Sequence, residues 1–247
     1  MDDAWSPPCA RLCRESRGGH HLLWPHGAAP PAPEWFDPAA LAASGRARTG
    51  GTGRAGTVYF DVDGRTLVLR HYRRGGLVRR LSADRYLHTG LTRSRPWREL
   101  AVLTRLHAAG LPVPPPVGAR VVRAQAGLYQ GDLLTQYLPG ARTLPELLSA
   151  DTAASATWRA LGATLARFHA AGLDHADLNA HNVVLDANAT VYLIDFDRAV
   201  IRPRRRRWCE RNLARLRRSL DKLAQTEAAF AFTKADWAWL RAGYRSG

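Results

Sequence analysis

The sequence predicts an α+β fold with two lobes: a small antiparallel β-sheet lobe that carries one helix, followed by a mainly helical lobe. Three patterns support this prediction. Residues 58–70 read as two strands around an Asp-Gly turn, and residues 183–194 read as a second, shorter hairpin. Apolar residues recur at helical spacing over 95–109 and again over 157–171.

Composition and charge limit the class of protein. The 247 residues are 46% hydrophobic, which is ordinary for a globular protein, and no run of about eighteen apolar residues exists that could span a membrane. The N-terminus carries early acids and no apolar core segment, so we do not expect a secretory signal. The three cysteines lack the spacing of a zinc site. The net charge of +15 favours a polyanionic partner: nucleic acid, an anionic membrane face or a phosphorylated substrate.

We expect three segments along the chain. The proline-rich residues 111–117 run extended, strands follow, and a connector begins near Tyr137. These features predict an N-terminal arm over 1–44 that packs partly on the first lobe, a first lobe over 45–137 and a second lobe over 138–247. Within the arm, His20–Trp24 reads as a short strand, and a short helix starts at Pro38.

A glycine-rich stretch precedes the first hairpin. Gly51, Gly53, Gly56 and Val58 fit the pattern G-x-G-x-x-G-x-V. Glycines let backbone N–H groups approach a phosphate closely, so these residues are expected to bind a nucleotide. A Rossmann loop shares the pattern but opens a helix and expects an acid about twenty positions on. Here the stretch runs into a strand, an arrangement typical of kinases.

A basic residue and a carboxylate complete the predicted nucleotide site. Glu99 lies in the early turns of the helix over 95–109, where kinase-like folds place a carboxylate that pairs with a basic strand residue. Most kinases have lysine on that strand, but this chain has Arg70, which is always charged and can fork to phosphate. We expect Arg70 to contact phosphate and to pair with Glu99. Arg73 or Arg74 could take this role instead.

The second hairpin lies within the stretch from His175 to Asp197. Its apolar runs, 183–185 and 191–194, are joined at residues 186–189, where Asp and Asn favour a turn. Folding of this hairpin brings residues ahead of its first strand close to residues just after its second strand.

Oxygen-bearing side chains therefore converge at one end of the hairpin. Asp177 and Asn182 precede it and Asp195 follows it, and Mg²⁺ prefers such oxygen ligands. The stretch also fits His-x-Asp-Leu-x-x-x-Asn followed by Asp-Phe-x, the pattern of protein-kinase-like phosphotransferases. Asp177 is the candidate base, Asp195 would coordinate Mg²⁺ and Asn182 would bind a second cation. We expect His175 to pack and to hydrogen-bond the loop.

Two further residues of the stretch have weaker assignments. His181, next to Asn182, is a candidate substrate contact. Asp197 replaces the glycine that usually follows Asp-Phe. It could be a third metal or substrate contact, or it could fix the turn.

The segment from Arg198 to Arg218 carries ten arginines and one acid, Glu210. Leucines at 213, 216 and 220 would give a helix here one apolar face. So many like charges repel one another unless an anion is near. We therefore expect the segment to bind an anionic substrate or membrane face. The candidate contacts are Arg198, Arg204, Arg205, Arg206 and Arg207.

Together these residues resemble the 3-deoxy-D-manno-octulosonic acid (Kdo) kinases of Gram-negative bacteria, in the lipopolysaccharide kinase group of the protein-kinase-like fold. The resemblance is carried by Trp35–Pro38, the glycines at 51–56, Leu67–Gly76, His175–Asn182 and Tyr192–Arg198. It implies ATP- and Mg²⁺-dependent phosphorylation of the 4-hydroxyl of Kdo on a Kdo–lipid A precursor in lipopolysaccharide core synthesis. It also implies peripheral attachment at the cytoplasmic side of the inner membrane. No nucleic acid and no obligate protein partner are expected.

Two alternatives remain at this point. The first is another kinase of the same fold, acting on a small molecule or a protein, because the fold does not set the acceptor. The second is a catalytically inactive pseudokinase or a basic module that binds membrane or nucleic acid. The presence of Asp177, Asn182 and Asp195 argues against the second alternative.

Overall fold

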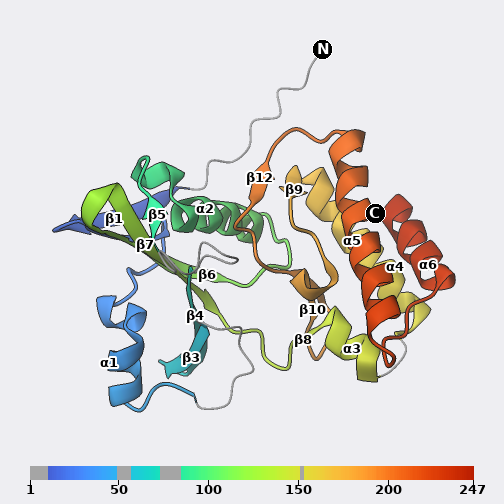
Figure 1. The fold of residues 1–247 in the computed structure, drawn as a ribbon, viewed down its shortest axis with the longest axis horizontal. Helices are drawn as coiled ribbons and strands as arrows, with labels where there is room; N and C mark the ends of the chain where they lie inside the picture. The colour runs from blue at the N-terminus through green and yellow to red at the C-terminus, as the bar shows by residue number, and fades with distance from the viewer. Residues whose placement is uncertain (1–10, 49–56, 73–84, 151–152) are drawn as a thin grey trace. The chain divides into compact units, whose positions relative to one another are not determined.

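The computed structural model describes residues 11–48, 57–72, 85–150 and 153–247 (Figure 1). The predicted glycine contacts Gly51, Gly53 and Gly56, like Arg73 and Arg74, lie outside the described residues.

The chain forms two compact units. The first unit contains the described residues up to Arg105 together with Pro114–Tyr137, and the second contains Leu106–Val113 together with Leu138–Gly247. The chain passes into the second unit after Tyr137, where the sequence analysis placed the connector.

The first unit is built on one antiparallel sheet. Its strands are β1 (Leu12–Arg17), β2 (His20–Pro25), β3 (Thr57–Val62), β4 (Arg65–His71), β5 (Tyr86–Leu87), β6 (Pro116–Arg123) and β7 (Leu128–Gln136). They pair in the order β1-β2-β6-β7-β4-β3, and β5 pairs with β7. The predicted hairpin is present as β3 and β4, with Asp63 and Gly64 at φ +48° and +70° in its turn. Both residues thus have the positive φ that tight hairpin turns of this kind require.

The expected N-terminal arm contributes β1 and β2 to this sheet. The predicted strand at 20–24 is β2, which pairs with β1 on one side and with β6 on the other. The predicted short helix is α1 (Pro38–Ala43), whose N-terminus is capped by the side chain of Asp37. Phe36 and Leu41 are fully buried in a core cluster with Phe60 of β3. The described part of the arm therefore contributes to this core cluster.

One long helix, α2 (Arg95–Ala108), occupies the predicted position. Its buried face includes Leu100 and Leu103. Near its start, a Cβ at Gly131 of β7 would lie 2.3 Å from Cγ of Pro96, so only glycine lets the helix approach the sheet this closely. This contact sets the position of the first turns of α2, which carry Glu99.

The second unit is mainly helical, as predicted. Its helices are α3 (Leu144–Ala150), α4 (Ser155–Ala170), α5 (Arg206–Thr226) and α6 (Lys234–Ser246). Its short strands are β8 (Arg142–Thr143), β9 (Leu173–His175), β10 (Val183–Leu185), β11 (Val191–Leu193) and β12 (Ala199–Ile201). Figure 1 shows the helices in yellow-green to red. No helix within the described ranges is long and apolar enough to cross a membrane.

Two short strand pairs of this unit frame the predicted catalytic stretch. β10 and β11 form the expected hairpin, with Val183 opposite Leu193. Oδ1 of Asp186 accepts hydrogen bonds from the backbone N–H groups of Asn188 and Thr190, both at 2.9 Å, as expected for an Asp-initiated turn. β9 pairs with β12, which places the start of the stretch beside the residues that follow its end.

Candidate active site

The loop between β9 and β10 carries Asp177, which is exposed to solvent. Its neighbour Leu178 is fully buried and anchors the loop in the core. The backbone N–H of Ala180 donates to Oγ of Ser219 on α5, at 3.1 Å. The loop thus presents a carboxylate to solvent from a backbone that is held at several points.

Asn182 holds the main chain of Asp177. Its Nδ2 donates to the carbonyl oxygen of Asp177 at 2.9 Å, and Nδ2 of Asn179 donates to the same oxygen at 3.0 Å. Oδ1 of Asn182 is buried and has no hydrogen-bond partner within the described part of the chain. A buried acceptor without a donor is costly unless a ligand satisfies it. The oxygen is therefore suited to bind a cation.

Asp195 follows Ile194, whose backbone N–H donates to the carbonyl oxygen of Asn182 at 3.1 Å. This bond brings the main chain at Asp195 close to Asn182. Asp195 has a φ of +66°, a left-handed conformation that side chains other than glycine rarely adopt. Such strain typically costs about 1–3 kcal/mol and concentrates at functional sites. The carboxylate of Asp195 and the amide oxygen of Asn182 are hard donors that fit Mg²⁺.

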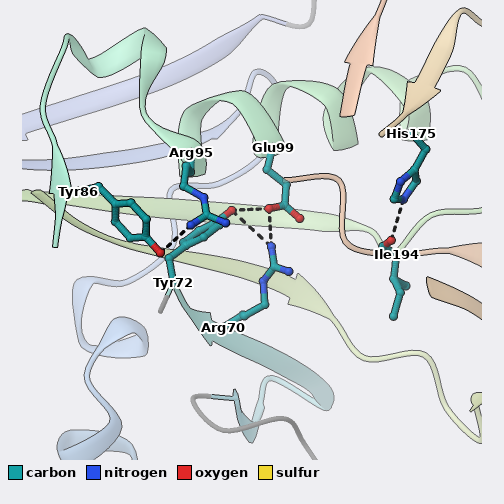
Figure 2. A network of polar contacts seen from close by, with 7 residues as sticks. All are labelled: Arg70, Tyr72, Tyr86, Arg95, Glu99, His175 and Ile194. Atoms are coloured by element: carbon teal, nitrogen blue, oxygen red, sulfur yellow. Dashed lines mark hydrogen bonds and ion pairs between the residues drawn. The ribbon is translucent and has the colours of Figure 1, made fainter. Parts of the chain in front are cut away.

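His175 supports this arrangement from inside the unit. Its Nε2 donates to the carbonyl oxygen of Ile194 at 3.1 Å, as Figure 2 shows, and its ring lies 5.3 Å from that of Phe196. Burial lowers the pKa of His175, so its imidazole is neutral near pH 7. The expectation that His175 packs and hydrogen-bonds the loop is confirmed.

The two remaining candidates of the stretch are the exposed His181 and the half-buried Asp197. His181 is exposed, and its backbone N–H donates to Oδ1 of Asn179 at 3.0 Å. The backbone N–H of Ala199 donates to the carbonyl oxygen of Phe196 at 2.9 Å, which places Asp197 and Arg198 at the centre of a tight turn. A structural position for Asp197 in the turn was one of the expected alternatives.

In the first unit, Arg70 and Glu99 form the predicted ion pair, between Nη2 and Oε2 (Figure 2). Glu99 is buried, whereas the side chain of Arg70 is 30% exposed. The hydroxyl of Tyr72 donates to the same Oε2 at 2.5 Å. The sequence analysis did not identify Tyr72. Its position two residues after Arg70, where strand side chains point to the same side, could have indicated it.

The arginine-rich segment is partly neutralised from within. Arg202 and Arg211 both bind Oδ2 of the buried Asp174, the latter at 3.1 Å, and Arg217 pairs with Asp221 at 2.8 Å. These acids supply part of the counter-charge that we had assigned to an external anion. Asp174 was missed because it lies upstream of the segment and is brought beside it by the pairing of β9 with β12.

Seven arginines of the segment are exposed, of which Arg211 is paired with Asp174: Arg198, Arg204, Arg205, Arg206, Arg207, Arg211 and Arg218. The acid within the segment, Glu210, binds Arg241 of α6 through both carboxylate oxygens, at 2.9 and 3.0 Å. Its charge is thus directed to an arginine outside the segment, and the start of α5 keeps a strongly positive surface.

Comparison with known proteins places these features in a family context. The model of the lipopolysaccharide kinase (Kdo/WaaP) family matches residues 40–244. The chain is 43% identical over 201 residues to the 3-deoxy-D-manno-octulosonic acid kinase of Stenotrophomonas maltophilia strain K279a, covering 81% of this chain and 79% of that one. It is 40% identical over 235 residues to the kinase of the same name from strain R551-3, covering 94% and 92% of the two chains.

A third relative of that name, from Xanthomonas axonopodis pv. citri strain 306, is 47% identical over 171 residues, or 69% of this chain and 68% of that one. Among solved structures, "WaaP in complex with acyl carrier protein" aligns with a TM-score of 0.52 and 21% identity over 84% of this chain and 82% of that one. The structural likeness confirms the predicted protein-kinase-like fold.

Proposed function

Because the chain belongs to the lipopolysaccharide kinase (Kdo/WaaP) family, we propose that it transfers the γ-phosphate of ATP to the 4-hydroxyl of Kdo on a Kdo–lipid A precursor, in lipopolysaccharide core synthesis. The observation that carries this proposal is the identity of 40–47% to kinases named for Kdo. The catalytic loop agrees with it, since Asp177, Asn182 and Asp195 are all present.

The second unit supplies the groups that act on the acceptor. Phosphoryl transfer needs in-line positioning and a group that orients the attacking hydroxyl and accepts its proton. The exposed carboxylate of Asp177 is suited to that task, and Asn182 and Asn179 keep its main chain in place. When bound by Asn182 and Asp195, Mg²⁺ would neutralise phosphate charge.

The first unit supplies groups that bind the donor. Glu99 is buried and forms an ion pair with Arg70, so it holds the guanidinium of Arg70 at a defined place. The side chain of Arg70 is partly exposed, and a guanidinium is suited to bind phosphate oxygens, as arginine does in many phosphate sites.

For the arginine surface at the start of α5, we propose peripheral binding to the anionic cytoplasmic side of the inner membrane. Four consecutive exposed arginines, Arg204–Arg207, lie there. Two of them, Arg206 and Arg207, occupy the first turn of α5, where the helix dipole disfavours cations. A nearby layer of phosphate groups would relieve that cost, and each basic residue near such a surface contributes about 1 kcal/mol to binding.

The test is an incubation of the protein with ATP, Mg²⁺ and a Kdo-bearing lipid A precursor, analysed by mass spectrometry. We expect a gain of one phosphate, located on the Kdo residue by fragmentation. A lipid A precursor without Kdo serves as the control and should gain none. Transfer to both acceptors, or to neither while another hydroxyl substrate is phosphorylated, would contradict the proposal.

A further inference from the structure

The side chains of Arg70 and Tyr72 meet at one carboxylate oxygen of Glu99 in the first unit. Oε2 of Glu99, on α2, accepts from Nη2 of Arg70 on β4 and from the hydroxyl of Tyr72, at 2.5 Å. Tyr72 is 4% exposed and Glu99 is 1% exposed, so the bond between them is shielded from water. Hydrogen bonds to a charged group are among the stronger ones in proteins, and burial strengthens them.

An arginine at this position has a problem that a lysine does not have. The ammonium of lysine is a point charge, whereas a guanidinium is planar and presents its donors in one plane only. Nη2 of Arg70 donates to Oε2 of Glu99 and also, at 3.5 Å, to the hydroxyl of Tyr72. A phosphate contact requires that plane to be set.

The ring of Tyr72 adds a further contact to this guanidinium. Cζ of Arg70 lies 5.0 Å from the centroid of this ring, within the range of a cation–π contact. The same residue therefore contacts the guanidinium with its ring and binds the carboxylate partner with its hydroxyl. Figure 2 shows Tyr72 between Arg70 and Arg95, next to Glu99.

Tyr72 is itself held by a second arginine. Cζ of Arg95 lies 5.2 Å from the centroid of the Tyr72 ring, and Nη1 of Arg95 donates to the hydroxyl of Tyr86 at 2.6 Å. Arg95 precedes Glu99 by four residues on α2, so the two side chains lie on the same side of the helix. Helix α2 thus supplies both Arg95, which contacts the ring of Tyr72, and Glu99, which accepts from its hydroxyl.

We propose that Tyr72 is a positioning residue for nucleotide binding, which sets the plane of the Arg70 guanidinium and holds Glu99 for it. This inference rests on the proposed function only in that Arg70 contacts the phosphates of ATP. It predicts that Tyr72 acts through Arg70, so its contribution to nucleotide affinity disappears when Arg70 is absent.

The test is a double-mutant cycle on the dissociation constant of ATP–Mg²⁺, measured by calorimetry without any acceptor. We expect Tyr72→Phe to weaken binding roughly tenfold in the wild-type background, the loss of one hydrogen bond to a charged group. In the Arg70→Ala background the same substitution should change the dissociation constant less than about twofold. If Arg70→Ala unfolds, as circular dichroism would show, Arg70→Gln takes its place.

A matched control separates positioning from folding. Tyr244→Phe removes a hydroxyl that lies 2.7 Å from Nδ1 of His169 in the second unit, so it should lower the melting temperature and leave the affinity for ATP–Mg²⁺ unchanged. Equal losses of affinity from Tyr72→Phe in both backgrounds, or no loss in either, would overturn the proposal. Because no acceptor is present, the result is independent of whether Kdo is the acceptor.

Discussion

Asn182 divides its amide between two tasks. Its Nδ2 donates to the main chain of Asp177, and its buried Oδ1 is left for a cation. The residue thereby couples the position of the candidate base to the candidate metal site. Because the bond is made to the main chain of Asp177, it does not depend on the charge of that side chain.

This geometry leads to a prediction for Asp177→Asn. The substitution keeps the size of the side chain and the main-chain bond from Asn182, but it removes the proton acceptor. We expect phosphate transfer to fall by about 10²–10⁴-fold, the usual contribution of a general base, while ATP–Mg²⁺ binding largely survives. Steady-state rates and equilibrium binding of the nucleotide would measure the two effects. Transfer at the wild-type rate would exclude Asp177 as the base.

Two buried histidines make the stability of the fold depend on pH. His169 contacts Tyr244 of α6, and its ring packs 5.3 Å from that of Trp208 of α5. Burial, assisted by the positive charge of Arg204, lowers the pKa of His169 from 6.5 to about 4. Burial also lowers the pKa of His175. Both side chains are therefore neutral in the folded protein at pH 7.

The consequence is a loss of stability in mild acid. The unfolded chain takes up a proton at His169 near pH 6.5 and the folded chain only near pH 4, so the free energy of unfolding should decrease as the pH falls through that window. The lowered pKa of His169 corresponds to a loss of about 3 kcal/mol in the free energy of unfolding at low pH, and this loss is absent above about pH 7.5. Denaturant unfolding at a series of pH values would measure it. His169→Gln should reduce the slope, whereas substitution of the exposed His107 by Gln should leave it as in the wild type.

At the scale of elements, α4 and α6 approach each other through glycine. A Cβ at Gly162 would lie 2.0 Å from the carbonyl oxygen of Leu240, and one at Gly243 would lie 2.1 Å from that of Arg159. Such distances are far below van der Waals contact, so the two backbones touch directly. Helical spacing of apolar residues over 157–171 predicted α4 but carries no sign of this close contact through glycine.

For Gly162→Ala, the sign of the change in the free energy of unfolding therefore tells whether helix propensity or the contact with α6 dominates. In an isolated helix, alanine in place of glycine is favourable by about 1 kcal/mol. Here the added methyl group must push α6 away, and we expect a net destabilisation of about 1–3 kcal/mol. Thermal or denaturant unfolding would measure it. An increase in stability would show that the two helices do not touch at Gly162.

The arginine-rich helix α5 also contacts both ends of the catalytic loop. Arg211 binds Asp174, which immediately precedes His175, and Ser219 accepts from the backbone of Ala180 within the loop. One face of α5 thus supports the loop while its first residues keep an exposed positive surface. The element joins the candidate base and the candidate anion-binding surface in one structural unit.

For the whole molecule, the position of charge matters as well as its amount. The net charge of +15 would attract any anionic surface, but we expect the exposed residues Arg204–Arg207 to dominate binding to anionic vesicles. Changing all four to Gln should weaken sedimentation with such vesicles at least roughly tenfold, less so at high salt.

A charge-matched variant provides the control for this experiment. The exposed residues Arg11, Arg14, Arg17 and Arg123 lie on and near the β1–β2 edge of the first unit, and changing them to Gln removes the same charge. We expect that variant to bind vesicles almost as well as the wild type. Equal weakening by the two variants would mean that only net charge counts, and unchanged binding of the Arg204–Arg207 variant would contradict membrane attachment through α5.

The division of the chain into units shows where local patterns stop being informative. The helical pattern over 95–109 predicted α2, yet Leu106–Val113 belongs to the second unit. There Pro112 accepts from the backbone of Leu193 on β11, and Gly110 accepts from Arg167 on α4. Helical periodicity reports which residues are buried but not against which element, so no sequence pattern could place this segment.

Local sequence patterns were sufficient to predict the main elements and the residues suited to phosphoryl transfer. Periodicity predicted α2, α4 and the two hairpins, because apolar spacing and turn residues act over a few positions. Residue types at fixed spacing predicted Asp177, Asn182 and Asp195, since phosphoryl transfer needs a base and oxygen ligands. The same reasoning predicted the ion pair of Arg70 with Glu99.

The contacts of those residues, in contrast, follow from the folded structure. The buried oxygen of Asn182, the left-handed backbone of Asp195 and the hold of Tyr72 on Arg70 and Glu99 all depend on neighbours brought together by folding. So does the neutralisation of Arg202 and Arg211 by Asp174. Contacts between residues distant in the chain arise from packing of whole elements, and that packing leaves no periodic signal in the sequence.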